Sequence, residues 1–251
     1  MKKKKLDNQF KKKGLLFKFL RLCVKVFFRG TKEYIGLENL PSEPCVCIGN
    51  HAHAYGPLNG ELKFPTKKLM WCDAPMFSRK EFVNYAYNNF FSKKPNVFLR
   101  ACINILSPLV AYIFKNADAM PVYRDMRIMK TYKISSETLL QGANVVIFPE
   151  CPEQYNEITN QFNEYFVDVA RFHYKHYQKE LLFVPFYYAP GLKKMIFGKP
   201  VKFDATRPIE EERKRICAYL MDEITTIAKE LPVHKVIPFH QVKKKDYKNS
   251  K

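Results

Sequence analysis

Residues 44–57 read Pro-Cys-Val-Cys-Ile-Gly-Asn-His-Ala-His-Ala-Tyr-Gly-Pro, and this stretch decides how the chain is organised. The apolar run at 44–48 lies between turn-forming residues and is typical of a buried strand. The run gives way abruptly to Asn50-His51, which places an imidazole at the carboxyl end of that strand. Open α/β folds bind ligands at this edge of their sheet. The pattern therefore predicts a functional loop, and the simpler alternative is a histidine that only caps the turn.

Strand-like and helix-like segments alternate along the rest of the chain. Apolar runs typical of strands lie at 67–72, 117–124, 143–149 and 181–187, with a strand-turn-strand at 194–203. Helical periodicity covers 98–114, 126–141, 157–178 and 208–230. This alternation predicts an α/β fold, a single mixed-sheet domain flanked by helices. We place that domain at 31–240, after a basic amphipathic helix at 1–30 and before a basic tail at 241–251.

Two of the predicted helices carry more specific expectations. The apolar helix at 98–114 is interrupted by Ser107-Pro108, which makes it short and kinked for a membrane span, so we expect a core or membrane-facing helix. His173 and His176 lie three apart in the helix at 157–178 and are expected to face solvent.

The basic charge of the chain is concentrated at its two ends. The formal net charge is +19, of which residues 1–29 carry +10 and residues 243–251 carry +4. The hydrophobic share of 47% is ample for a buried core and excludes a wholly disordered chain. Basic ends of this kind suit an anionic surface, either lipid headgroups or nucleic acid.

The N-terminal segment favours the lipid alternative. Its basic residues Lys18, Arg21, Lys25 and Arg29 recur at helical spacing, and Leu and Phe occupy most of the remaining surface. Charge at every turn excludes a secretory signal and a transmembrane span. We therefore expect a helix lying in the interface of an anionic membrane, on its cytoplasmic side. The alternatives are a basic helix packed on its own domain and, less favoured because no nucleic-acid motif is visible, a nucleic-acid-binding protein.

The seven cysteines are odd in number and scattered, and no two pairs have the spacing of a zinc site. Metal binding is therefore not expected, and a reducing compartment fits this cysteine usage. Cys45 and Cys47 lie two apart in a predicted strand, so we expect them on one face, acting as small apolar residues.

Three later stretches carry short motifs on or after predicted strands: Tyr123-Arg124, Phe148-Pro149-Glu150 and Val184-Pro185-Phe186. Together with Asn50-His51 they resemble the ordered motifs of the glycerolphospholipid acyltransferase family, which includes the 1-acylglycerol-3-phosphate (lysophosphatidate) acyltransferases. That family shows Asn-His-x4-Asp, a block ending in Arg, Phe-Pro-Glu-Gly-Thr-Arg and a Val-Pro block. The resemblance covers about residues 34–230.

The resemblance implies transfer of an acyl group from a thioester, acyl-CoA or acyl carrier protein, to a hydroxyl of a lipid or lysophospholipid-like acceptor. No bound cofactor or metal is implied. His51 would be the general base, a task that suits an imidazole with a pKa of about 6.5. Glu150 would complete the catalytic pair and help to hold the acceptor or the thioester. The substrate-binding residues implied are Asn50, His53, Tyr55, Gly56, Arg124, Pro149 and Glu153.

The sequence departs from the family motifs at two places. Gly56 stands where the family has the aspartate that orients the histidine, and Cys151-Pro152-Glu153 stands where it has Gly-Thr-Arg. Loss of the corresponding carboxylate in a serine-protease triad costs about 10⁴ in rate. An arginine that could bind a phosphate is replaced by Glu153, which would repel one.

Three accounts of His51 stay open at this point. A carboxylate from elsewhere could orient it, and the candidates are Glu61, Asp73 and Glu153. His53 could share the work. Alternatively, the chain has kept the fold and serves as a catalytically inactive module that binds lipid or acyl thioester. We favour a divergent acyltransferase because Asn50-His51 and Pro149-Glu150 are retained.

Overall fold

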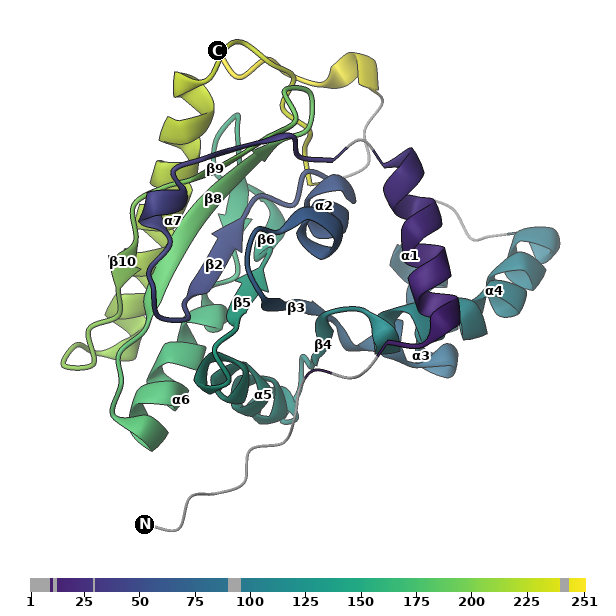
Figure 1. Ribbon diagram of the computed structural model, residues 1–251, viewed down its shortest axis with the longest axis horizontal. Helices are drawn as coiled ribbons and strands as arrows, with labels where there is room; N and C mark the ends of the chain where they lie inside the picture. The colour runs from purple at the N-terminus through teal and green to yellow at the C-terminus, as the bar shows by residue number, and fades with distance from the viewer. Residues whose placement is uncertain (1–9, 11–12, 29, 90–95, 240–243) are drawn as a thin grey trace.

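Strand β2 (Val46–Gly49) lies near the middle of a mixed, mostly parallel sheet (Figure 1). The computed structural model describes residues 10, 13–28, 30–89, 96–239 and 244–251. Over these residues eight strands form the sheet, in the order β1-β9-β8-β2-β5-β3-β4, with β10 paired to β8. The other strands of this sheet are β1 (Glu33–Ile35), β3 (Lys68–Asp73), β4 (Ala119–Val122), β5 (Asn144–Ile147), β8 (Leu182–Ala189), β9 (Lys194–Phe197) and β10 (Val201–Lys202).

The pairing directions bring several strand ends to one edge of the sheet. β2 runs parallel to both β5 and β8, and β3 runs parallel to both β5 and β4. β9 and β10 pair with β8 in the antiparallel direction. The loops that follow β2, β3, β4 and β5 therefore meet at a single edge. The predicted α/β fold, a mixed sheet flanked by helices, is confirmed.

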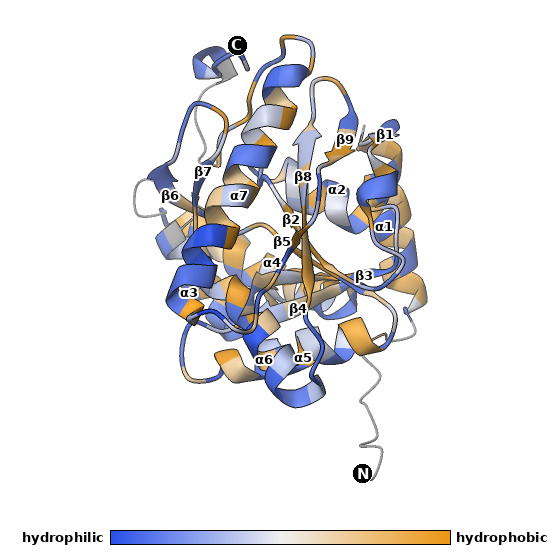
Figure 2. Ribbon diagram, turned by 90° about the vertical axis from the view of Figure 1, so that its left-hand side faces the viewer, coloured by the Kyte–Doolittle hydropathy of each residue, from blue (hydrophilic) through white to orange (hydrophobic). Residues whose placement is uncertain are grey.

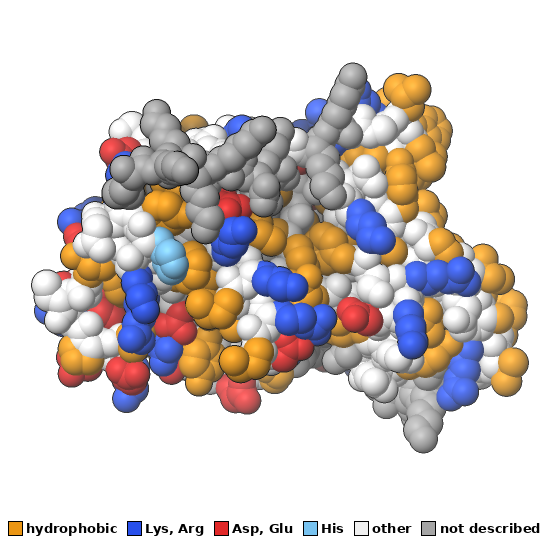
Figure 3. All heavy atoms as spheres, turned by 90° about the horizontal axis from the view of Figure 1, so that it is seen from below, with side chains coloured by type: hydrophobic (Ala, Val, Ile, Leu, Met, Phe, Trp, Pro, Cys, Tyr) orange, Lys and Arg blue, Asp and Glu red, His pale blue; other side chains and the backbone are white. Residues whose placement is uncertain are grey.

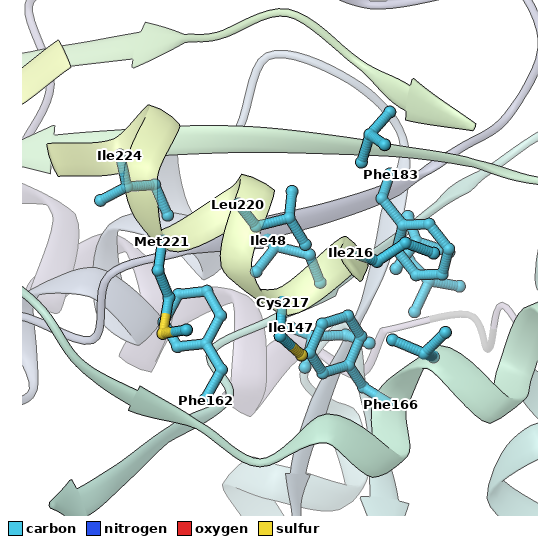
Figure 4. Close-up of a cluster of buried hydrophobic side chains, with 14 of the residues drawn as sticks. Ile48, Ile147, Phe162, Phe166, Phe183, Ile216, Cys217, Leu220, Met221 and Ile224 are labelled. Carbon is cyan, nitrogen blue, oxygen red and sulfur yellow. The ribbon is translucent and has the colours of Figure 1, made fainter. Parts of the chain in front are cut away.

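Helices cover both faces of this sheet. They are α1 (Leu15–Phe27), α2 (Tyr55–Lys63), α3 (Arg79–Asn89), α4 (Val97–Asn116), α5 (Ile128–Leu140), α6 (Asp168–Tyr177) and α7 (Ile209–Glu230). α5, α6 and α7 bury the larger core, in which Ile216, Leu220 and Ile224 of α7 lie over the sheet (Figure 4). α2 packs on the opposite face, where Gly60 approaches Met70 and Phe148. Figure 2 shows apolar strands at the centre of the domain, with helices of mixed hydropathy around them.

The alternation of side chains explains why residues 44–48 form a central strand. Val46 and Ile48 point into the larger core, whereas Cys45 and Cys47 point into the smaller one. A strand buried on both faces needs apolar residues at every position, which is why the run is continuous. The prediction that the two cysteines share one face is confirmed.

The predicted helix at 157–178 is wrong in its first half. Residues Glu150–Gln154 and Asn160–Phe162 form a second, two-stranded sheet, β6 and β7, and α6 begins only at Asp168. The buried carboxylate of Glu150 accepts hydrogen bonds from Thr159 and Asn160. These bonds fold the segment into a hairpin, and helical periodicity in the sequence does not reveal them.

The predicted interruption at Ser107-Pro108 is also wrong, because α4 runs as one helix from Val97 to Asn116. A proline in a helix deprives the carbonyl four residues earlier of its N–H donor. Here that carbonyl belongs to Asn104, and the hydroxyl of Ser107 donates to it at 2.8 Å. The serine beside the proline thus restores the missing hydrogen bond.

The structure also contains elements that the sequence did not predict. These are α2 and α3, which have low helical periodicity, the three-residue strand β1, and the hairpin strands β6 and β7. The predicted strand-turn-strand at 194–203 is present as β9 and β10. The basic N-terminal helix is present as α1, and the Lys-rich residues 1–9, 11 and 12 lie outside the described residues. His176 is exposed as expected, but His173 is buried in α6, which corrects the expectation that it faces solvent.

Candidate active site

Asn50 fixes the end of β2 at the edge of the sheet where the loops meet. Its side-chain oxygen accepts from the backbone N–H of Tyr188 at 2.7 Å, and its amide nitrogen donates to the carbonyl of the same residue at 3.1 Å. The side chain therefore continues the pairing of β2 with β8 by one more residue. Asn50 is buried and acts on the path of the backbone. Its contacts hold the start of the His51 loop.

The loop after Asn50 is a tight turn with two residues in the left-handed region. Ala52 has φ 44° and His53 has φ 54°, conformations that cost on the order of 1–3 kcal/mol each for residues other than glycine. The amide of Gly56 donates to the carbonyl oxygen of His51 at 3.0 Å and closes the turn into α2. This geometry brings the carbonyl oxygen of His53 onto Nδ1 of His51.

The His53 carbonyl determines which ring nitrogen of His51 carries the proton. A carbonyl oxygen only accepts hydrogen bonds, so Nδ1 of His51 is the donor in this contact. In the neutral imidazole the other nitrogen, Nε2, then keeps its lone pair. A histidine held in this tautomer is suited to accept a proton at Nε2.

Two aromatic rings enclose the imidazole of His51. Phe148 lies edge-on with ring centroids 5.8 Å apart, and Phe239 does the same from the C-terminal segment at 5.2 Å. Burial disfavours the charged imidazolium and lowers the pKa of His51 below its ordinary value, against a smaller opposing effect of the His53 carbonyl. The imidazole is therefore neutral at pH 7, which is the protonation state of a general base.

Glu150 supports the same loop from β6. One carboxylate oxygen accepts from the backbone N–H of His51 at 2.5 Å. The other accepts from the hydroxyl of Thr159 and from the N–H of Asn160, both at 3.1 Å. The side chain is buried. These contacts hold the backbone of His51, as a positioning residue would. The catalytic role expected for Glu150 from the sequence stays a prediction.

Arg124 and Asp73 form an ion pair at the same edge. The guanidinium of Arg124 lies 3.1 Å from the carboxylate of Asp73, which also accepts from the Tyr85 hydroxyl at 2.7 Å. The Arg124 side chain is largely exposed, so it can also contact a ligand. The charge of Asp73 raises the pKa of His51 slightly, although no hydrogen bond joins the two.

The remaining predicted residues lie on the elements around this loop. Tyr55 is exposed at the start of α2 and stacks on Phe28 at 6.4 Å. Pro149 is buried and its carbonyl accepts from the N–H of Asn163. Glu153 is exposed on β6. His53 acts through its main-chain carbonyl, while its ring is half-buried.

Of the three carboxylates considered as partners of His51, none is hydrogen-bonded to its imidazole in the described part of the chain. Glu61 lies at the other end of α2, paired with Lys68 at 2.7 Å and with Arg21 at 3.5 Å. A main-chain carbonyl occupies the place of the missing carboxylate. Within the described ranges no three His, Cys, Asp or Glu side chains cluster as metal ligands would.

Two contributors to the site escaped sequence reasoning. Phe239 lies near the C-terminal end of the chain, in a segment without the periodicity of a strand or a helix. Thr159 lies in a segment whose helical periodicity concealed the hairpin. The Asn156 side chain accepts from the N–H groups of Ile158 and Thr159 and makes the tight turn of that hairpin, so an Asn-initiated turn was the available signal.

Comparison with known proteins gives no further information. No family model matches the chain, no curated protein matches its sequence, and no solved structure matches its fold. The likeness to the glycerolphospholipid acyltransferases therefore rests on the sequence motifs alone, and the chemistry has to be argued from the site.

Proposed function

We propose that the chain is a peripheral membrane acyltransferase that moves a fatty acyl group from an acyl thioester to a hydroxyl of a lipid acceptor. The observation that carries this proposal is the state of His51. Its imidazole is neutral through burial, has Nδ1 engaged by the His53 carbonyl and keeps the lone pair of Nε2 for a proton.

The reaction at this base is a direct transfer. Nε2 of His51 takes the proton of the acceptor hydroxyl while its oxygen attacks the thioester carbonyl carbon. The tetrahedral intermediate collapses, the carbon–sulfur bond breaks, and the leaving thiolate takes the proton back from the imidazolium. The His53 carbonyl stabilises that imidazolium through its dipole. A carboxylate would do so more strongly, so we expect slower turnover than with a histidine–aspartate pair.

The surroundings of the base favour particular substrates. Exposed Arg124 can bind an anionic part of either substrate, since its side chain is 82% exposed despite the ion pair with Asp73. Glu153 stands exposed where the resembled family has an arginine, and it would repel an acceptor phosphate there. The acceptor proposed is therefore a lipid hydroxyl other than that of a glycerol phosphate.

The membrane part of the proposal rests on α1. Its side chains Lys18 and Lys25 are exposed, as are most of its apolar residues, and only Phe17 is buried. A helix of this composition lies in the interface of an anionic leaflet. The cytoplasmic leaflet of a membrane is such a surface.

The test is an acyl-transfer assay with radiolabelled acyl-CoA and acyl carrier protein against a panel of lipid and alcohol acceptors. We expect His51→Gln to abolish transfer and leave the circular-dichroism spectrum unchanged. His176→Gln is the matched control, because His176 is an exposed histidine away from the loop. Turnover that survives the His51 change would show that another group is the base.

A binding module without catalysis is the second candidate. The observation that favours it is the ring of Phe239, which packs on His51 and restricts access to the imidazole. This alternative predicts that the wild-type chain binds acyl-CoA or lysophospholipid in equilibrium dialysis and transfers no acyl group to any acceptor of the panel.

A further inference from the structure

The helices α1 and α4 carry apolar side chains that the rest of the described chain leaves exposed. On α1 these are Leu15, Leu16, Phe19, Leu22, Val24, Val26 and Phe27, and on α4 they are Val97, Phe98, Ile105, Leu106 and Leu109. We call these residues the two-helix face. Figure 1 places both helices at one end of the molecule, and Figure 3 shows hydrophobic and basic side chains gathered over that end. The hydroxyl of Tyr112 on α4 lies close to Gly14 at the start of α1.

The helix α4 is apolar on its outer side as well as on its inner side. A narrow stripe of Ile103, Ser107 and Ala111 is buried, and Ile103 packs with Phe82 and Ala86 of α3. On the outer side, Phe98 is 78% exposed and Ile105 is 76% exposed. A helix on the surface of a globular protein normally places polar residues there. An outer surface of this kind indicates contact with an apolar medium.

The charges of the two helices indicate which medium that is. α1 contains Lys18, Arg21 and Lys25, α4 contains Arg100 and Lys115, and neither helix contains Asp or Glu. Arg21 is paired with Glu61 of α2, whereas Lys18 and Lys25 of α1 are exposed and make no described ion pair. Apolar side chains with exposed cations beside them are complementary to anionic headgroups above an acyl layer. A second copy of the chain would present the same positive charge, and like charges facing each other oppose association.

The connections of α4 favour a position along the membrane surface. It is the one helix of the described residues long and apolar enough to cross a bilayer. Its inner stripe nevertheless packs on α3, and β4 enters the sheet at Ala119, three residues after the helix ends at Asn116. A helix tied to the domain along its length can dip into the interface without spanning the bilayer.

We propose that the two-helix face of α1 and α4 docks onto an anionic phospholipid bilayer, with α4 inserted into the acyl boundary beside α1. The basic residues of α1 supply an attraction that salt weakens, and the apolar outer side of α4 supplies one that salt does not weaken. This inference rests on the membrane part of the proposed function and is independent of its chemistry.

The test is flotation of the full chain with vesicles of phosphatidylcholine and phosphatidylglycerol, in low salt and in about 1 M salt, where screening extends only about 3 Å. We expect Phe98→Ser/Ile105→Ser to lower the partition coefficient roughly tenfold or more at high salt, because two large apolar side chains leave the acyl layer. The matched control is Met126→Ser/Val233→Ser, which removes two exposed apolar side chains outside the face.

A charge variant separates the two contributions. Lys18→Gln/Lys25→Gln should lower partitioning roughly tenfold at low salt and have little effect at high salt. Circular dichroism establishes that each variant is folded. The proposal is overturned if the α4 variant partitions like the wild type, or if light scattering shows a dimer that only this variant dissociates. If the chain floats with vesicles as expected but transfers no acyl group, the proposed chemistry is refuted and the proposed membrane docking of the two-helix face is still supported.

Discussion

Gly56 packs directly against the carbonyl of His51: a β-carbon at position 56 would lie 2.5 Å from that oxygen, closer than real atoms approach. It would also lie 2.7 Å from the carbonyl oxygen of Asn50. The turn that brings the His53 carbonyl to the imidazole therefore requires a residue without a side chain here. The aspartate of the resembled motif is incompatible with this path of the loop, in which a main-chain carbonyl occupies its place at Nδ1.

This contact predicts that Gly56→Asp damages the site. We expect Gly56→Asp and Gly56→Ala to lower the free energy of unfolding by about 1–3 kcal/mol, as overpacking does in a tight site, and to reduce acyl transfer together. Urea denaturation and kcat/KM measure the two effects. Gly191→Ala is the control, since no atom lies within 4 Å of a β-carbon there. A gain of activity in Gly56→Asp alone would show that the loop can adopt the resembled motif.

The hydrogen bonds of Glu150 predict a positioning role. In Glu150→Gln an NH₂ group would face one of the donors that the carboxylate now accepts from, namely the N–H of His51, the hydroxyl of Thr159 or the N–H of Asn160. We expect a loss of about 1–3 kcal/mol in unfolding free energy, the cost of a buried donor without an acceptor. We also expect kcat to fall while the pKa seen in the pH–rate profile stays with His51.

Two further variants separate this role from direct catalysis. Thr159→Val removes one donor of the same network and should reduce kcat in the same direction, with a smaller effect. Glu153→Gln changes a neighbouring exposed carboxylate and should leave stability unchanged. A pH–rate profile that loses a limb in Glu150→Gln, with stability intact, would assign Glu150 a proton-transfer role and refute positioning.

The buried ring of His173 predicts a pH-dependent loss of stability. It is 2% exposed, its Nδ1 has no partner in the described part of the chain, and burial lowers the pKa of His173 to about 4. Between pH 6.5 and 4 the unfolded chain takes up a proton that the folded chain does not. Stability therefore falls as the pH drops through this window, and no further loss arises from this group below it.

The variant His173→Phe removes that dependence. We compare the change in unfolding free energy that this substitution causes at pH 5 with the change that it causes at pH 8. We expect the value at pH 5 to be more favourable to the variant by about 1–2 kcal/mol. Urea denaturation at both values gives the measurement, with His176→Phe as the exposed control. An equal effect at pH 5 and pH 8 would mean that the folded chain protonates His173 as readily as the unfolded chain does.

The fold was predictable where burial on both sides of the sheet dictates the composition. β2, β5 and β8 read as continuous apolar runs because α7 covers one face and α2 with Phe64 covers the other. The hairpin of β6 and β7 was not predictable in the same way. It depends on one buried carboxylate, Glu150, binding groups nine and ten residues further along the chain.

The site was predictable in its location and not in its contacts. The order of strand ends located His51, Arg124 and Glu150, because parallel strands bring their carboxyl ends to one edge. The partner of the imidazole was not predictable, since it is a main-chain atom of His53, displayed by left-handed backbone that neither Ala52 nor His53 favours. The contact of Phe239 with His51 joins residues far apart in the sequence, and no local pattern near either residue predicts it.

The enclosure of His51 predicts the pH dependence of the proposed reaction. A protonated Nε2 cannot act as a base, so activity falls as the pH drops through the pKa of His51. Burial holds that pKa below 6.5. We therefore expect the acid limb of kcat/KM to have its midpoint below 6.5, and a midpoint above that value would contradict a buried base.

Two substitutions should move this limb in opposite directions. Phe239→Ala removes a ring 5.2 Å from the imidazole and admits water, which favours the imidazolium and raises the midpoint toward 6.5. Asp73→Asn removes a negative charge that stabilises the imidazolium, so it lowers the midpoint slightly. Val233→Ala, an exposed change in the same C-terminal segment, is the control and should leave the profile in place. If neither the Phe239 nor the Asp73 substitution moves the midpoint of the acid limb, the limb reports another group. His51 would then be structural.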